Sequence, residues 1–586
     1  MTTPLLTTLR QHLKARGIDA LYVPTADPHQ SEYVGEHYQT RAFLTGFTGS
    51  AGTAVVTAEH ALLWTDGRYF IQAERQIKDR GFSLMRLNTP GFPSVTDWLC
   101  THMPAGGTLA FNGRTLSRAQ YDELSRALDA KGVRLLADDT VLESLWENRP
   151  ALPQEAVFLH ELRFSGETTA SKLARLRDAL GDLDGTVMSS LENIGWLFNF
   201  RGRDIAHNPV AYAYAVVTPA TAVLYLDRAK YDDAFAREMT DNGVTLKPYD
   251  AVWSDAGSIT GRIAVDKKRT SQALYQALSQ ADLVSAPEHV YALKARLNDT
   301  EEANQRETWL EDTTALVRFL IWLEQAVPAG DIDECRAADM LSAIRSRGRH
   351  YLEDSFDTIS AYGDNAPMMH YRATPDSSRL LEPKGLYLVD TGGQYLGGTT
   401  DITRTVSLGE PTAEEIRDYT LVLKAHINLA TAVFLHGASG HYLDVLARQP
   451  LWQEHIDYKS GTGHAVGYVS GVHEGPQRIA MMPNNVTLEP GMMITNEPGI
   501  YREGVHGIRL ENVYIVKEDV TVGSDRFLKF DCLSYAPFDR RLIDVSALSE
   551  KELSWLNAYH RDVCERLLPR LNEDERVWLA AKTAQL

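Results

Sequence analysis

The N-terminal part of the chain alternates amphipathic and apolar segments. Apolar side chains recur at helical spacing before the short apolar run 20–23, which predicts a helix that leads into a strand. The apolar runs 53–56 and 61–64 flank a polar turn and predict a β-hairpin. Asp66 follows this hairpin, and we expect its side chain to cap a helix that opens at 66–70.

The same pattern returns further along the chain. The strand-like run AVVT occurs at 54–57 and again at 215–218, and FLTGFTG at 43–49 is echoed by WLFNFRG at 196–202. Both copies have the same order of apolar strand, aromatic-glycine turn, hairpin and capped helix, which favours a duplication. We therefore predict two similar α/β domains with a boundary near the proline-containing segment 149–153.

A third domain is predicted to begin near residue 298. Residues 298–302 have the composition of a capped helix start, and apolar side chains continue at helical spacing behind them. Strands and helices then alternate to about residue 520. From Ser549 onward the pattern is helical, and we interpret this C-terminal segment as structural, with Trp555 and Leu556 packed on the domain.

Length and composition agree with several folded domains. The 586 residues exceed what one hydrophobic core supports, so two to four domains are expected. Apolar residues make up 44% and charged residues 23%, which is typical of a folded chain. No apolar run approaches the length of about 18 residues that a membrane span needs. The first residues also lack the basic start and apolar run of a secretory signal.

Charge and cysteine content narrow the function classes. The 59 basic and 78 acidic residues give a net charge of −19, and no basic cluster offsets it. Such a surface repels nucleic-acid phosphates and anionic lipids, so we expect neither as a partner. The cysteines are scattered without a CxxC pair, which argues against a disulfide framework or a thiolate metal site: Cys100, Cys335, Cys532 and Cys564. A cytoplasmic location fits this composition best.

Two aspartates flank a glycine-rich connection in the third domain. The apolar strand 385–389 ends at Asp390, and a second strand follows Asp401. If the glycines at 392, 393, 397 and 398 form the connection, a hairpin brings both carboxylates to one place. The alternative, that both are ordinary turn aspartates, stays open on this pattern alone.

A histidine and two glutamates complete the set of candidate ligands. His464 lies among small residues at 460–467, where the backbone can approach closely. Glu497 ends another apolar strand. In the predicted strand 507–516, Arg509 and Glu511 share one face because side chains repeat with period two. The alternative to a ligand role is that Arg509 neutralises Glu511.

The charge of this set favours a two-metal site. Four clustered carboxylates would carry four negative charges and raise one another's pKa. Two divalent cations would balance them. Oxygen-rich ligands with one histidine favour Mn²⁺ or a similar ion, although Co²⁺ or Zn²⁺ can occupy such a site.

These motifs resemble the metallopeptidase family of methionine aminopeptidase, prolidase and aminopeptidase P, which shares the pita-bread fold. The resemblance is closest to the three-domain cytosolic Xaa-Pro aminopeptidases. It covers the chain from about residue 8 to beyond 560 and rests on several motifs: RAFLTGFTGSAGTAVV, LLWTDGRYF, NIGWLFNFRG, GTGHAVG, GVHEGP, TNEPGIY and IRLENV.

The resemblance implies a fold and an activity. The fold would be α/β, with two similar creatinase-N-terminal-like domains at 1–152 and 153–297 and a pita-bread catalytic domain with its helical segment at 298–586. The activity would be removal of the residue that precedes proline at a peptide N-terminus. A homodimer formed through the catalytic domain is also implied, with the N-terminal domains limiting access.

The resemblance further assigns the ligands of two metals. Asp390 corresponds to the ligand of one metal alone. Asp401 and Glu511 correspond to bridging carboxylates, and His464 and Glu497 to ligands of the other metal. A water shared by the two ions would lose a proton near neutral pH. Glu497 is expected to act as general base and to carry the proton to the leaving proline nitrogen.

Four further residues correspond to substrate-binding positions. His370 and His473 would hydrogen-bond the carbonyl oxygen as it gains charge, and Tyr501 and Arg509 would line the pocket for the proline ring. One departure is Ser460, because aminopeptidases P usually carry a histidine four residues before the histidine ligand. A serine is shorter and uncharged, which changes the proline-side pocket, whereas the metal site does not depend on this position.

Two other functions compete with this one. Prolidase shares the metal site but cleaves Xaa-Pro dipeptides, and prolidase-like chains generally have one N-terminal domain. A catalytically inactive binding protein on the same fold would have lost ligands, whereas all five are present here. Xaa-Pro aminopeptidase activity is therefore the favoured prediction.

Overall fold

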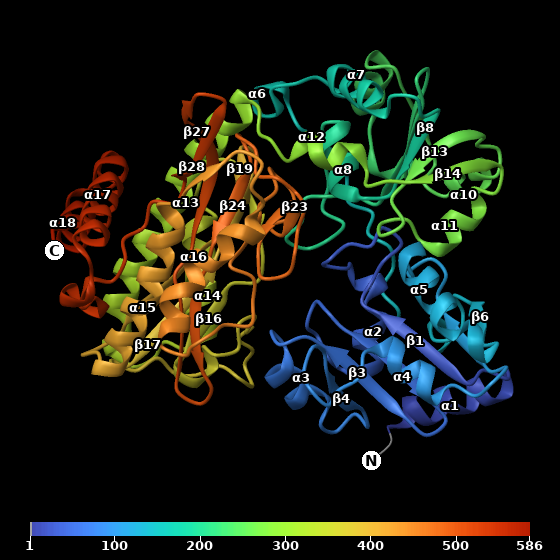
Figure 1. The fold of residues 1–586 in the computed structure, drawn as a ribbon, viewed down its shortest axis with the longest axis horizontal. Helices are drawn as coiled ribbons and strands as arrows, with labels where there is room; N and C mark the ends of the chain where they lie inside the picture. The colour runs from blue at the N-terminus through green and yellow to red at the C-terminus, as the bar shows by residue number, and fades with distance from the viewer. Residues whose placement is uncertain (1–2) are drawn as a thin grey trace. The chain divides into compact units, whose positions relative to one another are not determined.

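The computed structural model describes residues 3–586, which divide into two compact units (Figure 1). The N-terminal unit comprises residues 3–162 and 167–293, and the C-terminal unit comprises 163–166 and 294–586. A helix that crosses a bilayer needs length and apolarity together, and no helix within residues 3–586 combines the two.

The N-terminal unit contains two six-stranded mixed sheets with the same topology. The strands of the first sheet follow the order β4-β3-β2-β1-β5-β6 and those of the second the order β12-β11-β10-β8-β13-β14. The bounds are β1 (Ala20–Pro24), β2 (Thr53–Thr57), β3 (Ala61–Thr65), β4 (Ser83–Arg86), β5 (Thr108–Phe111), β6 (Arg134–Ala137), β8 (Gly185–Met188), β10 (Ala213–Val217), β11 (Ala222–Leu226), β12 (Val244–Lys247), β13 (Gly261–Val265) and β14 (Ala281–Ser285).

The predicted duplication is confirmed by strand pairing. The two AVVT copies fall on β2 and β10, which hold the same place in their sheets. Each of these strands pairs antiparallel with both of its neighbours, and the outer pairs of both sheets are parallel. A short ladder joins β7 (Phe158–Leu159) to β9 (Phe200–Arg201).

Helices pack against both sheets of this unit (Figure 1). The first, α1, leads into β1 as predicted. The bounds are α1 (Pro4–Ala15), α2 (Thr40–Thr45), α3 (Phe70–Ile77), α4 (Val95–His102), α5 (Arg118–Leu128), α6 (Leu162–Ser165), α7 (Thr169–Leu180), α8 (Leu191–Leu197), α9 (Asp233–Asp241), α10 (Ala251–Ala256), α11 (Gln272–Ala277) and α12 (His289–Lys294).

The expected helix cap at Asp66 is wrong. Helix α3 starts at Phe70, its N-cap residue is Tyr69, and no side chain bonds the cap. Asp66 instead accepts a hydrogen bond from the backbone N–H of Arg68 at 3.1 Å and also binds the Arg68 guanidinium. The reason is local, since an aspartate carboxylate readily closes a turn with the N–H two residues further on.

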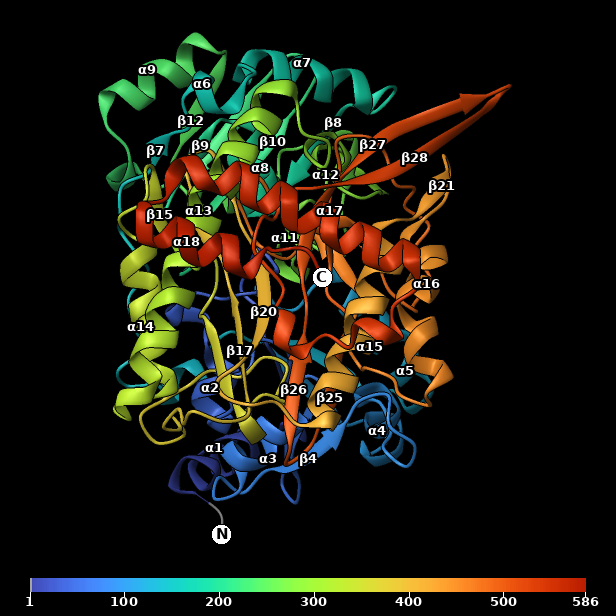
Figure 2. The same ribbon diagram turned by 90° about the vertical axis from the view of Figure 1, so that its left-hand side faces the viewer.

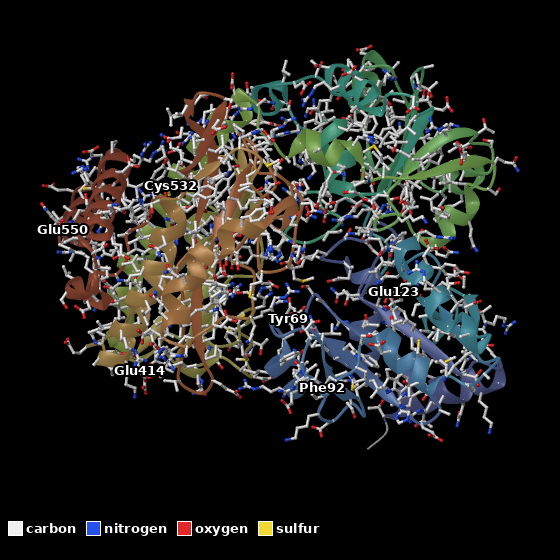
Figure 3. All side chains as sticks on the ribbon, in the orientation of Figure 1. Tyr69, Phe92, Glu123, Glu414, Cys532 and Glu550 are labelled. Atoms are coloured by element: carbon white, nitrogen blue, oxygen red, sulfur yellow. The ribbon has the colours of Figure 1, made fainter. Side chains whose placement is uncertain are left out.

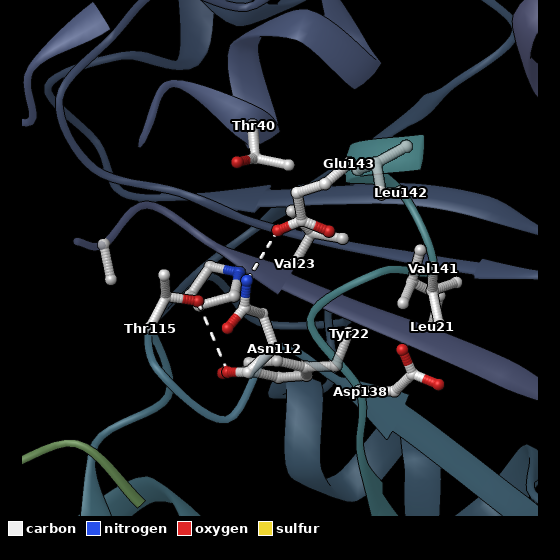
Figure 4. A pocket seen from close by; sticks show the side chains of 12 residues that line it. Leu21, Tyr22, Val23, Thr40, Asn112, Thr115, Asp138, Val141, Leu142 and Glu143 are labelled. Atoms are coloured by element: carbon white, nitrogen blue, oxygen red, sulfur yellow. Dashed lines mark hydrogen bonds between the residues drawn. The ribbon is translucent and has the colours of Figure 1, made fainter. Parts of the chain in front are cut away.

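One small cavity lies beside β1 in the first sheet (Figure 4). Its volume is about 20 Å³, which is room for about one water molecule. Asn112 Nδ2 donates a 2.6 Å hydrogen bond to Glu143 Oε1 across its wall. This cavity is therefore too small to hold an organic ligand.

The C-terminal unit begins with a long capped helix, as predicted. The side chain of Asn298 caps α13 (Asp299–Ala326), and Glu301 bonds back to the backbone of Asn298 in a capping box. Trp309, Leu316 and Leu320 of this helix are buried in the core of the unit. Three further helices belong to the body of the unit: α14 (Glu334–Arg345), α15 (Ala413–Ala430) and α16 (Gly440–Gln453).

Five small sheets complete the body of this unit, in the orders β15-β18-β19, β16-β17-β20, β21-β28-β27-β24, β22-β23 and β25-β26. Figure 2 shows β17 and β20 side by side. The bounds are β15 (Tyr351–Asp354), β16 (Ile359–Tyr362), β17 (Leu386–Thr391), β18 (Gly393–Tyr395), β19 (Gly398–Thr399), β20 (Ile402–Ser407), β21 (Val433–Leu435), β22 (Gly463–Ala465), β23 (Glu474–Ile479), β24 (Met493–Asn496), β25 (Gly499–Arg502), β26 (His506–Arg509), β27 (Asn512–Val522) and β28 (Asp525–Cys532).

The C-terminal helices pack on this body, which confirms the predicted packing of the segment. Ser549 caps α17 (Glu550–Leu567), and α18 (Glu573–Lys582) follows beside it (Figure 2). Both helices contact α13. Leu556 is buried in the core, and Trp555 packs against it.

Candidate metal centre

The hairpin prediction for the two aspartates is confirmed. Strands β17 and β20 pair antiparallel, with Asp390 opposite Thr403, and Asp401 directly precedes β20. The connection turns at 396–397, and its two sides meet closely at Gly392, where a Cβ atom would lie only 1.9 Å from the Thr400 carbonyl oxygen. Only glycine fits there, so the close return of the chain places both carboxylates at one end of the hairpin.

His464 lies on β22 and faces two of the carboxylates. Its Nε2 atom is 3.4 Å from Asp401 Oδ2 and 3.5 Å from Glu497 Oε1. Its Nδ1 atom is 3.0 Å from the carbonyl oxygen of Ala465, a contact that orients the ring. Gly463 lets β22 approach β24, because a Cβ atom there would lie 2.1 Å from the Thr495 carbonyl oxygen.

The two glutamates stand at the ends of strands. Glu497 directly follows β24, as predicted. The predicted single strand 507–516 is wrong, since β26 ends at Arg509 and β27 begins at Asn512. The chain changes sheets here, because β26 pairs with β25 whereas β27 pairs with β24 and β28. Glu511 therefore lies in the junction between two sheets.

The carboxylates and His464 converge on one spot. Ligand atoms of Asp401, His464 and Glu511 all lie within 4.8 Å of one another, the one such group found within the described residues. Burial is the main cause that raises the pKa of Glu497 to about 7, and the charge of Asp390 adds to it. Burial, followed by neighbouring carboxylates, raises the pKa of Asp401 and of Glu511 well above the usual range.

This set of donors fits divalent cations. Asp390 Oδ1 is buried and has no hydrogen-bond partner within residues 3–586, which is costly unless a cation binds it. Carboxylate oxygens with one imidazole nitrogen are the ligands of hard to borderline divalent ions. Two such ions would also balance the four negative charges.

Arg509 supports the cluster from the side. Its guanidinium donates to Asp390 Oδ2 at 2.5 Å, to the Tyr501 hydroxyl at 2.8 Å and to Thr403 Oγ1 at 3.1 Å. The Thr403 hydroxyl in turn donates to Glu511 Oε2 at 2.8 Å. Arg509 therefore forms its ion pair with Asp390, and the alternative in which it serves to neutralise Glu511 is not favoured.

The two predicted substrate histidines lie beside the cluster. The ring of His473 is 4.4 Å from the ring of His464 and 6.1 Å from the ring of His370, measured between centroids. His473 directly precedes β23, and His370 belongs to the segment between β16 and β17. The structure thus brings together every residue singled out as a candidate ligand or substrate contact.

The contacts of two threonines with the candidate ligands were not predicted from the sequence. Thr403 bonds Arg509 and Glu511, and Thr495 accepts from the backbone N–H of His464 at 3.1 Å and lies 3.4 Å from Glu497 Oε1. Each lies two residues from a candidate ligand, Asp401 or Glu497. The period of two along a strand was the available signal, because it puts such neighbours on one face.

Comparison with known families defines the class of protein. Residues 310–518 match metallopeptidase family M24, and 526–586 match the C-terminal region of that peptidase family. Residues 6–145 and 148–301 each match the creatinase/prolidase N-terminal domain. The fold and the site therefore define an M24 metallopeptidase. Along the chain, two creatinase-type domains precede a pita-bread domain, as the resemblance implied.

Relatives that match over the full length of the chain show which M24 subfamily it belongs to. The chain is 37% identical to a probable Xaa-Pro aminopeptidase P of Laccaria bicolor, covering 100% of this chain and 94% of the relative. It is 37% identical to aminopeptidase P2 of Arabidopsis thaliana, covering 97% and 86%. An X-prolyl aminopeptidase of Caenorhabditis elegans, described as a cytosolic enzyme with a di-nuclear active site, superposes with a TM-score of 0.94 at 34% identity and covers 99% of both chains. The chain belongs to the Xaa-Pro aminopeptidase P family.

The raised pKa of Glu497 predicts how the metal-free protein responds to pH. The folded state binds this proton more tightly than the unfolded chain does, because the pKa is about 7 instead of 4.5. The free energy of unfolding therefore falls as the pH rises through this window. We expect a lower melting temperature at about pH 8 than at about pH 6 after chelation, and recovery on adding Mn²⁺.

Thermal denaturation of the chelator-treated protein checks this dependence. The Glu497→Gln variant is the matched control, and its melting temperature should vary less between the two pH values because it lacks one of the shifted groups. A metal-free protein whose melting temperature rises from pH 6 to pH 8 would contradict the account, since Asp401 and Glu511 shift in the same direction.

Proposed function

We propose that this protein is a metal-dependent exopeptidase that hydrolyses the N-terminal Xaa-Pro bond of peptides. The observation that carries the proposal is the convergence of Asp401, His464 and Glu511 within 4.8 Å. Asp390 and Glu497 complete the five-ligand set. The full-length similarity to Xaa-Pro aminopeptidases P supports this choice of substrate class.

We assign the metal ligands as follows. Asp390 would hold one ion, His464 and Glu497 would hold the other, and Asp401 and Glu511 would be shared by both. The orphan Oδ1 atom of Asp390 and the contact distances around His464 support this division. When bound, the two ions would supply Lewis-acid activation of a water and of the substrate carbonyl. We propose Mn²⁺ as the ion because the ligand set is rich in oxygen.

Glu497 and the two substrate histidines move and hold protons in this scheme. Glu497 accepts a proton from the attacking water and passes it to the leaving proline nitrogen. His473 and His370 donate hydrogen bonds to the carbonyl oxygen as it gains negative charge. The neighbouring rings of His464, His473 and His370 support this assignment, since they place both donors beside the ligands.

Tyr501 and Arg509 form the wall that accepts proline. A proline nitrogen carries a ring and has no N–H, so its pocket must offer apolar surface without requiring a donor. The hydrogen bond between Tyr501 and Arg509 holds the aromatic ring in place. The hydroxyl oxygen of Ser460 is buried without a hydrogen-bond partner within residues 3–586. The resemblance assigns position 460 to the proline side of the pocket, so a serine there removes the histidine usual in the family.

Two alternatives are less well supported. An Xaa-Pro dipeptidase of Bacillus anthracis shares the fold over 64% of this chain at 22% identity with a TM-score of 0.53, and this is a likeness of fold alone. The two creatinase-type matches favour the longer aminopeptidase architecture over prolidase. An inactive binding protein would have no need for five intact ligand positions.

Hydrolysis of a matched peptide pair tests the proposed function. The Mn²⁺-loaded protein should release the first residue of Xaa-Pro-Yaa much faster than that of Xaa-Ala-Yaa, and should cleave the Xaa-Pro dipeptide poorly. The Glu497→Gln variant should lose about 10²–10⁴-fold in kcat, because it cannot accept a proton. Mass spectrometry of the products gives the cleaved bond.

Metal content of the Glu497→Gln variant is the necessary control, since Glu497 is also proposed as a ligand. Equal metal content with lost turnover supports the proton-transfer role. Wild-type turnover in this variant would remove Glu497 from the mechanism. Preference for the dipeptide would replace the proposed function with that of a prolidase.

We also propose that the protein forms a homodimer through the C-terminal unit. An exposed apolar patch on α16 and after β23 supports this, with Tyr442 70% and Val445 45% exposed and with Trp452, Met481 and Met482 also exposed. The two elements contact each other, and exposed apolar side chains gathered in this way are typical of association sites.

Sedimentation analysis of Val445→Glu tests the dimer. We expect the variant to sediment as a monomer where the wild type is a dimer, because a buried unpaired charge is costly. Val577→Glu on α18 is the control, since Val577 is exposed outside the patch, and it should stay dimeric. A dimeric Val445→Glu variant, or a monomeric wild type, would contradict the proposed interface.

A further inference from the structure

A small hairpin carries both residues of the proposed proline wall. Tyr501 lies on β25 and Arg509 on β26, and these two strands form a two-stranded sheet by themselves. A two-stranded hairpin is marginally stable alone, so contacts from other elements must fix its position. Those contacts decide where Tyr501 and Arg509 meet the substrate.

The end of the hairpin beside the metal centre is held by β20. The hydroxyl of Thr405 accepts from the backbone N–H of Arg509 at 3.2 Å and donates to its carbonyl oxygen at 3.1 Å. Ile500 and Ile508, one on each strand, are buried in the core. These contacts anchor the base of the hairpin but leave the angle of its far end to other groups.

The far end of the hairpin is bound to α15 through Asp418. Arg502 and His506 form the last cross-strand pair before the turn. Arg502 donates to both oxygens of Asp418, with Nε 2.5 Å from Oδ2 and Nη2 2.9 Å from Oδ1. His506 Nε2 lies 3.0 Å from Oδ2. Asp418 thus joins both strands of the hairpin to a long helix of the core.

The environment of Asp418 keeps it charged for this contact. Its side chain is fully buried, and burial alone would raise its pKa, but hydrogen bonds from His506, Arg502 and Arg417 hold the pKa well below its usual range. Glu414, labelled in Figure 3, lies one turn earlier on α15 and is 3.7 Å from Arg502. Two carboxylates of one helix therefore face the same arginine.

The hairpin also supports the segment that carries His370. A Cβ atom at Gly507 would lie 2.2 Å from the Ala366 carbonyl oxygen, so β26 and this segment meet backbone to backbone. Arg509 Nη2 donates to the carbonyl oxygen of Met369 at 3.3 Å. A change in the angle of the hairpin would therefore shift both sides of the substrate pocket.

We propose that Asp418 is a positioning residue that sets substrate binding by clamping the β25–β26 hairpin through Arg502 and His506. The inference rests on the proposed function, because the hairpin carries the residues assigned to the proline wall. Asp418 acts on the substrate only through this hairpin. Asp401 lies beside β20 and His464 on β22, and Thr405 holds the end of the hairpin next to the metal centre, so the metal should stay bound when the clamp is loosened.

Steady-state kinetics of Asp418→Asn and Arg502→Gln in the full-length Mn²⁺-loaded protein test the clamp. We expect KM for Xaa-Pro-Yaa to rise about tenfold in each variant with metal content unchanged, because displaced pocket groups lose much of their effect. The double variant should raise KM little beyond Asp418→Asn alone, since both changes remove the contact between Asp418 and Arg502. Simple loss of folded protein would lower kcat and leave KM unchanged.

Asp312→Asn is the matched control. Asp312 is also fully buried and ion-paired, to Arg345 at 2.6 Å, but it lies on α13 and outside the hairpin contacts. This variant should lose stability while keeping the wild-type KM. If Asp418→Asn does not fold, the partly exposed Arg502 still gives a test through Arg502→Gln.

The outcomes separate the clamp from the proposed function. Wild-type KM in both Asp418→Asn and Arg502→Gln, with the wild-type protein cleaving Xaa-Pro-Yaa, would overturn the clamp alone. A wild-type protein that does not prefer Xaa-Pro-Yaa over Xaa-Ala-Yaa would overturn the proposed function instead. If KM changes by the same factor in Asp418→Asn and in Asp312→Asn, Asp418 only stabilises the fold and does not position the substrate pocket.

Discussion

Repulsion among buried carboxylates is the constraint on which the rest of the C-terminal unit depends. Asp390, Asp401, Glu497 and Glu511 stand close together where little water can screen them, and burial with mutual repulsion raises the pKa of three of them. A fold that gathers such groups must hold them against this repulsion. Hairpins closed by glycine, strand ends and an arginine bound to Asp390 do so, and two divalent cations would remove the cost.

Successive shells of hydrogen-bonded side chains hold the metal ligands in position. Thr403 and Thr495 hold the carboxylates directly, Arg509 joins Asp390 to the substrate wall, and Asp418 ties that wall to α15. Each shell uses hydrogen bonds or ion pairs that are largely shielded from water, where such contacts keep their strength. Arg509 therefore links chemistry at the centre to recognition of the substrate, because it contacts both Asp390 and Tyr501.

Much of this could be predicted from sequence where the signal is local. Short stretches of sequence predict the cap at Asn298 and the duplicated strand pattern. The glycines after Asp390 imply that the chain folds back closely on itself. The predictions failed where one sequence pattern is compatible with two local structures. Asp66 suits a turn as well as a helix cap, and apolar alternation runs through Glu511 although the chain changes sheets there. The contact of Arg502 with Asp418 joins residues 84 positions apart, and no local pattern marks it.

The central claim is that five side chains bind two metal ions, and metal content measures it most directly. The protein would be stripped with a chelator, loaded with Mn²⁺, freed of excess metal and analysed by inductively coupled plasma mass spectrometry beside Asp401→Ala. The account predicts about two ions per wild-type chain and a clear loss in the variant, because Asp401 is assigned to both ions. A wild-type chain that retains no metal, or an Asp401→Ala chain that retains the full amount, would contradict it.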